Sequence, residues 1–369
     1  MKTILFSFKS FCTASLIFVS LSLLSCGGGG GSASGSDSTA SSASNDEAII
    51  GAGSSFDNPL FSKMFSEYNK LNGLKVNYQS VGSGAGIAQL TSKTVDFGAS
   101  DAPMNGKQDS AVSSPVIHIP ITAGAVVMSY NLPEVKDTLL LTPGVLADIF
   151  LGKITKWNDP KIAAINKGAK LPATSILIAH RSDGSGTTNI FTTYLAKVSP
   201  EWNTKVGKGS SVNWPAGLGG KGSEGVAGLI KQTPGAIGYI EIAYAIQNNM
   251  AFAKVQNKAG NFITPSIASV TAAANIQIPA DSKVSLTNTD AADGYPISGF
   301  SWVLIYKEQK YGDRTADKTT KLLKLISWMI HDGQQYSGAL NYAPLSPAAV
   351  SVGDAILKSA TYDGKPILQ

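Results

Sequence analysis

Three short segments of this sequence combine glycines with hydroxyl side chains, and each lies between an expected strand and an expected helix. They are Gly51-Ala-Gly-Ser-Ser-Phe56, Gly82-Ser-Gly-Ala-Gly86 and Arg181-Ser-Asp-Gly-Ser-Gly-Thr187. Glycines let the backbone turn tightly beside a ligand, and the helix that follows directs its N-terminal amides and the positive end of its dipole at the same point. One such segment alone is also typical of ordinary helix capping. Three together favour a binding site for an anion.

The third segment opens with Arg181, one of two arginines in the chain. It follows an apolar run, and its planar guanidinium suits bidentate contact with a tetrahedral oxyanion. Asp183, two residues later, is expected either to orient that guanidinium or to form an Asx-type turn. The other arginine, Arg314, lies in a polar stretch and is expected to be a solvated surface residue.

Asp101 follows another expected strand, at a position where residues of a ligand crevice are found. Its carboxylate would repel a fully ionised anion such as sulfate. Phosphate keeps at least one P–OH near neutral pH and can donate it to a carboxylate. Sites that require a ligand hydrogen reject ligands without one by factors on the order of 10⁴ to 10⁵. Asp101 therefore favours phosphate, and the alternative is that it caps the turn after the strand.

Other chemistries find less support in the sequence. The histidines His118, His180 and His331 are far apart and form no metal-binding motif, and His180 is expected to pack at the end of a strand. Gly82 to Gly86 also satisfies the G-x-S-x-G pattern of serine hydrolases, with Ser83 as nucleophile, but no histidine base lies in a plausible place. We expect no enzyme activity, no cofactor and no metal, and keep a phosphatase or serine hydrolase using Ser83 as a less favoured alternative.

The segments around these loops alternate between short apolar runs and helical patterns. Strands are expected at 48–50, 74–79, 95–99, 175–179 and 235–239, and helices at 59–71, from 87 onward and at 188–196. This order predicts an α/β fold in which mostly parallel sheets are flanked by helices. A ligand site is expected at the carboxyl ends of the strands.

Two further apolar strands, at 125–131 and 301–306, are predicted to connect two lobes. Lobe I would then be discontinuous, made of residues 48–126 and 300–369, and lobe II would be residues 127–299. The fold predicted from this organisation is a two-lobed, type II periplasmic-binding-protein-like fold with two hinge strands.

The first 25 residues are predicted to be a lipoprotein signal peptide, because Lys2 and Lys9 precede a short apolar run that ends in Leu23-Leu24-Ser25-Cys26. Cys26 would carry the lipid, and residues 26–47 would form a Gly/Ser tether. An uncleaved membrane anchor is the alternative. The net charge of +5 comes from 30 basic and 25 acidic residues without basic blocks, so no nucleic-acid partner is expected.

Seven segments in order resemble the phosphate-binding proteins of Pst ABC transporters. They are the segments 51–56, 76–84, 94–103, 151–157, 180–187, 217–222 and 234–239. The resemblance implies capture of inorganic phosphate in the cell envelope and delivery to transmembrane permease subunits driven by ATPase subunits. It also implies a monomeric receptor, exported and lipid-anchored in the periplasm or at the outer face of the membrane. A receptor for another oxyanion, of the sulfate or molybdate class, is the alternative.

Carried over motif by motif, the resemblance implies phosphate contacts from Ser54, Ser55, Phe56, Ser83, Asp101, Arg181, Ser185, Gly186 and Thr187. Ser54 and Phe56 would contribute amides, Asp101 would accept the phosphate proton, and Asp183 would orient Arg181. Asp57 departs from the family pattern, in which many members have proline. We expect the Asp57 carboxylate to face solvent or a nearby lysine, because a carboxylate in the cleft would weaken anion binding.

Overall fold

The structure is a computed structural model that describes residues 48–368. The predicted signal peptide, Cys26 and the Gly/Ser tether lie outside the described residues. The described residues belong to one compact unit. In the described part of the chain, no helix has the length and apolar character needed to cross a membrane.

The main sheet has nine strands, in the order β2-β1-β3-β12-β4-β8-β6-β7 with β9 paired to β4. Its strands are β1 Ile49–Gly53, β2 Val76–Ser80, β3 Phe97–Ser100, β4 Val116–Tyr130, β6 Leu177–Arg181, β7 Leu218–Gly220, β8 Ala236–Glu241, β9 Ala251–Phe252 and β12 Ser298–Tyr306. The short strands β5 Leu140–Leu141, β10 Lys254–Gln256 and β11 Phe262–Ile263 form a second sheet, and β13 Thr361–Tyr362 pairs with β14 Lys365–Pro366.

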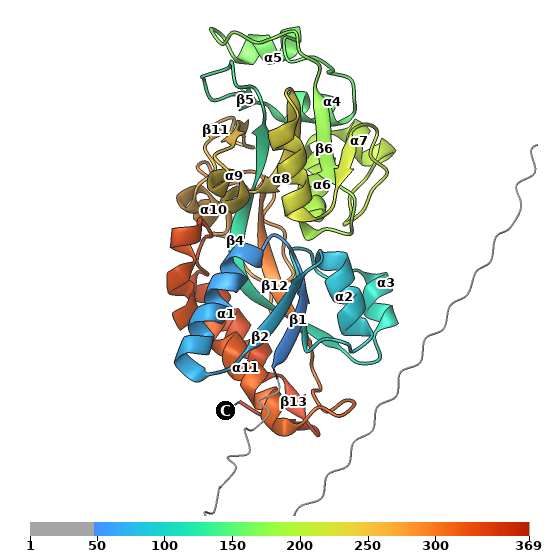
Figure 1. The fold of residues 1–369 in the computed structure, drawn as a ribbon, viewed down its shortest axis with the longest axis vertical. Coiled ribbons are helices and arrows are strands. Elements are labelled where there is room, and N and C mark those ends of the chain that lie inside the picture. The colour runs from blue at the N-terminus through green and yellow to red at the C-terminus, as the bar shows by residue number, and fades with distance from the viewer. Residues whose placement is uncertain (1–47, 369) are drawn as a thin grey trace, which may run out of the picture. The chain divides into compact units, whose positions relative to one another are not determined.

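Helices follow most strands and cover the sheet. They are α1 Asn58–Asn72, α2 Ser83–Thr91, α3 Gly106–Ala111, α4 Pro143–Phe150, α5 Pro160–Ile165, α6 Gly186–Val198, α7 Pro200–Lys205, α8 Gly222–Gln232, α9 Ile242–Gln247, α10 Ile267–Ala273, α11 Ala316–Ile330 and α12 Pro347–Lys358, with short 3₁₀ turns η1 Asp332–Tyr336 and η2 Gly338–Leu340. Figure 1 shows α1 and α11 on one side of β1 and β2, and α2 and α3 on the other side.

Two antiparallel strands, β4 and β12, join two groups of parallel strands. β1 pairs in parallel with β2 and β3, and β6 pairs in parallel with β7 and β8. The first part of β4 pairs with β12, and its last five residues, Val126–Tyr130, pair with β8. The α/β fold is confirmed, with a sheet that is parallel within each group and antiparallel where the groups meet. The division into lobes at residues 126 and 300 stays a prediction.

The helical stripe predicted for residues 59–71 is largely confirmed. Leu60, Phe61, Met64 and their neighbours on that face of α1 are buried, because they pack against the sheet. Leu71, which the pattern also assigned to the stripe, is 65% exposed. It lies in the last turn of the helix, just before Gly73 ends it in a left-handed conformation.

The prediction that Arg314 is a solvated surface residue is wrong. Arg314 is 8% exposed and donates to the Asp96 carboxylate at 2.5 Å and to the Gln309 side chain at 2.7 Å. Asp96 in turn accepts the Ile50 amide at 2.7 Å. The ion pair therefore ties β1 and the start of β3 to the segment before α11, over a sequence separation of 218 residues.

Arg314→Ala should destabilise the protein, because it removes the buried guanidinium that donates to Asp96 and Gln309 and leaves Asp96 with only the longer contact to Lys318, at 3.2 Å, among the ion pairs of the described residues. Loss of one member of a buried pair costs about 3–5 kcal/mol, measurable by urea denaturation. Lys70→Ala, which removes an exposed partner of Glu67, is the control. If Arg314→Ala lost no more free energy of unfolding than Lys70→Ala, the stabilising role of the Arg314–Asp96 ion pair would be contradicted.

Candidate anion-binding site

The three glycine-rich loops predicted from the sequence converge in the structure, and a fourth segment joins them. α1, α2 and α6 begin at or directly after these loops, and α8 begins directly after β7. The Gly186 amide, at the start of α6, donates to the Ser83 hydroxyl of α2 at 3.0 Å. The Ser223 amide, in the first turn of α8, donates to the Ser55 hydroxyl at 3.0 Å. Four helix N-termini thus meet at one place, which concentrates donor groups and positive dipole ends there.

Glycine is required where these loops touch. The Gly84 amide donates to the Gly184 carbonyl at 2.9 Å. Gly82 has φ near +90°, and a Cβ atom there would lie 2.1 Å from an Asp183 carboxylate oxygen. A larger residue at position 82 would therefore force the second and third loops apart.

Arg181 is buried at the end of β6, and its guanidinium is held by Asp183. The two hydrogen bonds measure 2.8 and 2.5 Å, and Asp183 also accepts the Gly222 amide at 3.0 Å. Burial opposes both charges, but their mutual contact prevails, so the pKa of Arg181 is raised and the pKa of Asp183 is lowered. The predicted contact between Asp183 and Arg181 is confirmed, and both side chains stay charged at neutral pH.

Asp101 also lies where the loops converge, and its exposed fraction is 3%. It accepts hydrogen bonds from the hydroxyls of Ser54, Thr187 at 3.1 Å and Ser301 at 3.2 Å. Burial raises its pKa to about 6, against the opposing effects of these hydroxyls and of the Arg181 charge. The carboxylate is therefore ionised near neutral pH and able to accept a further hydrogen.

The remaining predicted residues lie around this point in different roles. Ser185 caps α6 through the Thr188 amide at 3.1 Å, and Phe56 is buried with its ring against Tyr342. The predicted use of the Ser54 amide is not supported, because that amide donates to the Ala99 carbonyl at 2.9 Å. The reason is that the parallel pairing of β1 with β3 continues one residue past Gly53.

His180 packs as predicted, with its ring stacked on Trp214 at 4.9 Å between centroids. Within residues 48–368, no three His, Cys, Asp or Glu side chains gather in a way that could hold a metal ion.

The sequence reasoning missed Ser301, Ser223 and Tyr244. Ser301 sits within an apolar strand and gives no local signal. Ser223 follows the glycine-rich segment 217–222, and that segment could have identified it as a fourth loop residue. The Tyr244 hydroxyl donates to the Ser55 carbonyl at 2.6 Å and so supports the first loop from α9.

The prediction that Asp57 faces solvent or a lysine is wrong. Asp57 is fully buried, and one of its carboxyl oxygens lies 2.5 Å from the Ser301 hydroxyl oxygen. Burial, and next to it the negative charge of Asp101, raise the pKa of Asp57 well above its ordinary value. The physical reason for its placement is that β12 passes close to the start of α1 and covers the residue that precedes the helix.

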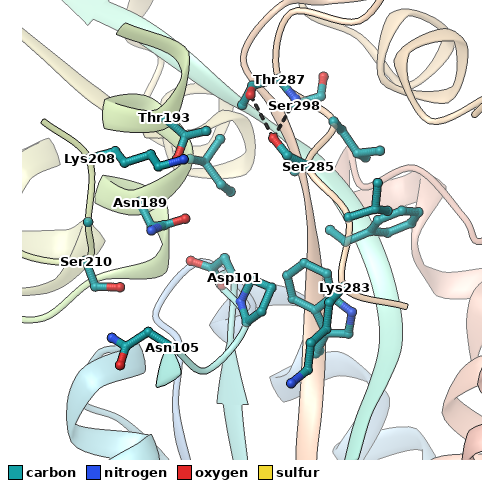
Figure 2. A pocket seen from close by; sticks show the side chains of 18 residues that line it. Asp101, Asn105, Asn189, Thr193, Lys208, Ser210, Lys283, Ser285, Thr287 and Ser298 are labelled. Carbon is teal, nitrogen blue, oxygen red and sulfur yellow. Dashed lines mark hydrogen bonds between the residues drawn. The ribbon is translucent and has the colours of Figure 1, made fainter. Parts of the chain in front are cut away.

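A cavity of about 430 Å³ adjoins Asp101. Figure 2 shows Asp101 near the middle of the view, with Asn105, Asn189 and Lys208 to its left and Lys283 to its right; all five side chains line the cavity. Lys208 and Lys283 thus border the cavity, and Asp101, a hydrogen-bond acceptor of the loop site, also lines it.

The fold and the converging loops define a solute-binding protein of the type II periplasmic-binding-protein class. Residues 38–332 match the PBP superfamily domain. The chain is 44% identical over 329 residues to the phosphate-binding protein PstS of Pasteurella multocida, covering 88% of this chain and 94% of that protein. It is 45% identical over 308 residues to PstS of Haemophilus influenzae, covering 82% and 90%. The chain therefore belongs to the PstS family of phosphate-binding proteins.

Solved structures agree on the fold. A high-affinity periplasmic phosphate-binding protein, PfluDING, bound with phosphate, matches with a TM-score of 0.66 at 22% identity, covering 84% of this chain and 93% of its own. A phosphate-binding protein from Stenotrophomonas maltophilia matches with a TM-score of 0.62 at 17% identity, covering 82% and 92%.

Proposed function

We propose that this protein binds inorganic phosphate at the converging loops and delivers it, chemically unchanged, to the permease of an ABC importer. The observation that carries the proposal is that Arg181 and Asp101, a fixed donor and a fixed acceptor, are buried at the point where four helices begin. The relatives named phosphate-binding protein PstS support the same ligand.

Phosphate can use both the donor, Arg181, and the acceptor, Asp101. Its oxygens accept hydrogen bonds from the Arg181 guanidinium and from the first-turn amides of α6, and its P–OH donates to Asp101. The direct contacts now made by Ser54 with Asp101 and by Gly186 with Ser83 are the ones that such a ligand would exchange for its own. We propose that Ser55, Phe56 and Thr187 also contact the ligand, in addition to Arg181, Asp101, Ser54, Ser83 and Gly186.

Side-chain charge alone does not explain anion binding here. Arg181 is balanced by Asp183, and Asp101 adds a second carboxylate. Amides, hydroxyls and helix dipoles must therefore supply the net attraction. This arrangement favours an anion that can also donate, and so favours phosphate over sulfate.

The remaining parts of the proposal follow the family. Residues 48–126 with 300–369 and residues 127–299 would act as two lobes that close on the ligand through β4 and β12. The receptor would be exported and monomeric, would be held at the membrane by a lipid on Cys26, and would meet permease and ATPase subunits of an importer there.

Calorimetry with phosphate and sulfate tests the ligand. Phosphate should bind at least about 100-fold more tightly than sulfate, because sulfate has no hydrogen to donate to the Asp101 carboxylate and is repelled by its charge. Arg181→Ala should weaken phosphate binding at least about 100-fold, and Arg181→Lys, which keeps the charge without the planar fork, should fall between. Circular dichroism checks that each variant is folded. Sulfate binding as tight as that of phosphate would refute the role given to Asp101.

Association kinetics test whether phosphate approaches through the cavity beside Asp101. Lys208 and Lys283 border this cavity. Burial, and after it the positive charges of Lys208 and Lys258, lower the pKa of Lys197 nearby. The double variant Lys208→Gln with Lys283→Gln should slow association by about two- to tenfold at low salt and less at high salt. Lys70→Gln on α1 is the control. An unchanged rate at low salt would rule out this route.

A further inference from the structure

Two buried carboxyl groups, Asp57 and Asp101, share one hydroxyl. The Ser301 oxygen lies 2.5 Å from one Asp57 oxygen, 3.2 Å from one Asp101 oxygen and 3.3 Å from the Ser100 carbonyl oxygen. A serine hydroxyl has a single hydrogen and can donate it to only one of them at a time. If both carboxyls were ionised, lone pairs would face each other across one of these contacts, and two negative charges would be buried side by side. A proton on one of the two carboxyls removes both the repulsion and the carboxyl contact that lacks a hydrogen.

The surroundings place that proton on Asp57. Asp101 has the hydroxyls of Ser54 and Thr187 and the nearby charge of Arg181 to stabilise its ionised form. Within the described residues, the second Asp57 oxygen has no hydrogen-bond partner.

The titratable groups that act on Asp57 from neighbouring elements offer it no positive charge to match that of Arg181 near Asp101. They are Asp101 after β3, Tyr78 of β2, Glu241 at the end of β8 and Tyr342 before α12. Burial and the Asp101 charge raise the pKa of Asp57 well above its ordinary value, whereas the pKa of Asp101 rises only to about 6.

We infer that Asp57 is a positioning residue whose protonated carboxyl donates to Ser301 and thereby turns the Ser301 hydroxyl toward Asp101. Asp101 then receives three hydroxyl hydrogens and is held ionised, as an acceptor for the phosphate P–OH. This inference rests on the proposed phosphate function. Ionised Asp57 would draw the Ser301 hydrogen away and add a second charge that repels the anion.

Infrared difference spectroscopy of the full chain without ligand tests the proton directly. The spectrum of the wild type minus that of Asp57→Asn, at neutral pH, should contain the carbonyl stretch of a protonated carboxyl. The carboxylate bands should not change. Carboxylate bands in place of the protonated band would overturn the inference. This readout does not depend on phosphate, so it separates failure of the inference from failure of the proposed function.

Phosphate titration of matched variants tests the positioning. Asp57→Asn keeps a neutral donor toward Ser301 and should bind phosphate within about threefold of the wild type. Ser301→Ala removes a hydrogen bond to a charged group and should weaken binding by about tenfold or more. Ser129→Ala removes another buried hydroxyl, which donates to Ala251, and should leave the affinity unchanged. A folded Asp57→Asn variant that loses tenfold or more would overturn the inference, as would a Ser301→Ala variant no weaker than Ser129→Ala.

Discussion

The contact between Arg181, Asp183 and the loops that enclose them is the constraint on which the rest of the site depends. A buried guanidinium needs a carboxylate, and Asp183 provides it with two hydrogen bonds while also accepting the first amide of α8. Gly82 must lack a side chain so that the second loop can lie against this pair. The pair therefore sets the distance between segments that are about one hundred residues apart in the chain, and this closeness is what could enclose a small anion.

The charges of the site argue for a ligand that both donates and accepts. The Arg181 guanidinium lies near two ionised carboxylates, those of Asp101 and Asp183. The attraction for an anion must therefore come from the helix N-termini and the hydroxyls, which carry no formal charge. In the proposed phosphate site, selectivity would then depend on which carboxyls hold a proton. Asp101 must remain an acceptor, and Asp57 must not add a third negative charge to those of Asp101 and Asp183. The buried Ser301 hydroxyl links these two conditions because it touches both carboxyls.

Much of the fold and the core of the site could be predicted from the sequence, because they depend on local patterns. Strand, glycine loop and helix start follow one another within a few residues, and Asp183 lies two residues from Arg181. The failures involve partners distant in the chain. Arg314 meets Asp96 across 218 residues, and Asp57 meets Ser301 across 244 residues. Polar spacing alone gave no sign that these charged side chains are buried, because burial depended on strands arriving from elsewhere.

The most direct test of the account is a crystal structure of the protein grown with phosphate. We expect one anion enclosed among the loops, with the Arg181 guanidinium and the first-turn amides of α6 donating to its oxygens. One further oxygen should lie within hydrogen-bond distance of the Asp101 carboxylate. Phosphate seated only on the lysines of the neighbouring cavity, with Arg181 and Asp101 making no contact to it, would contradict the account.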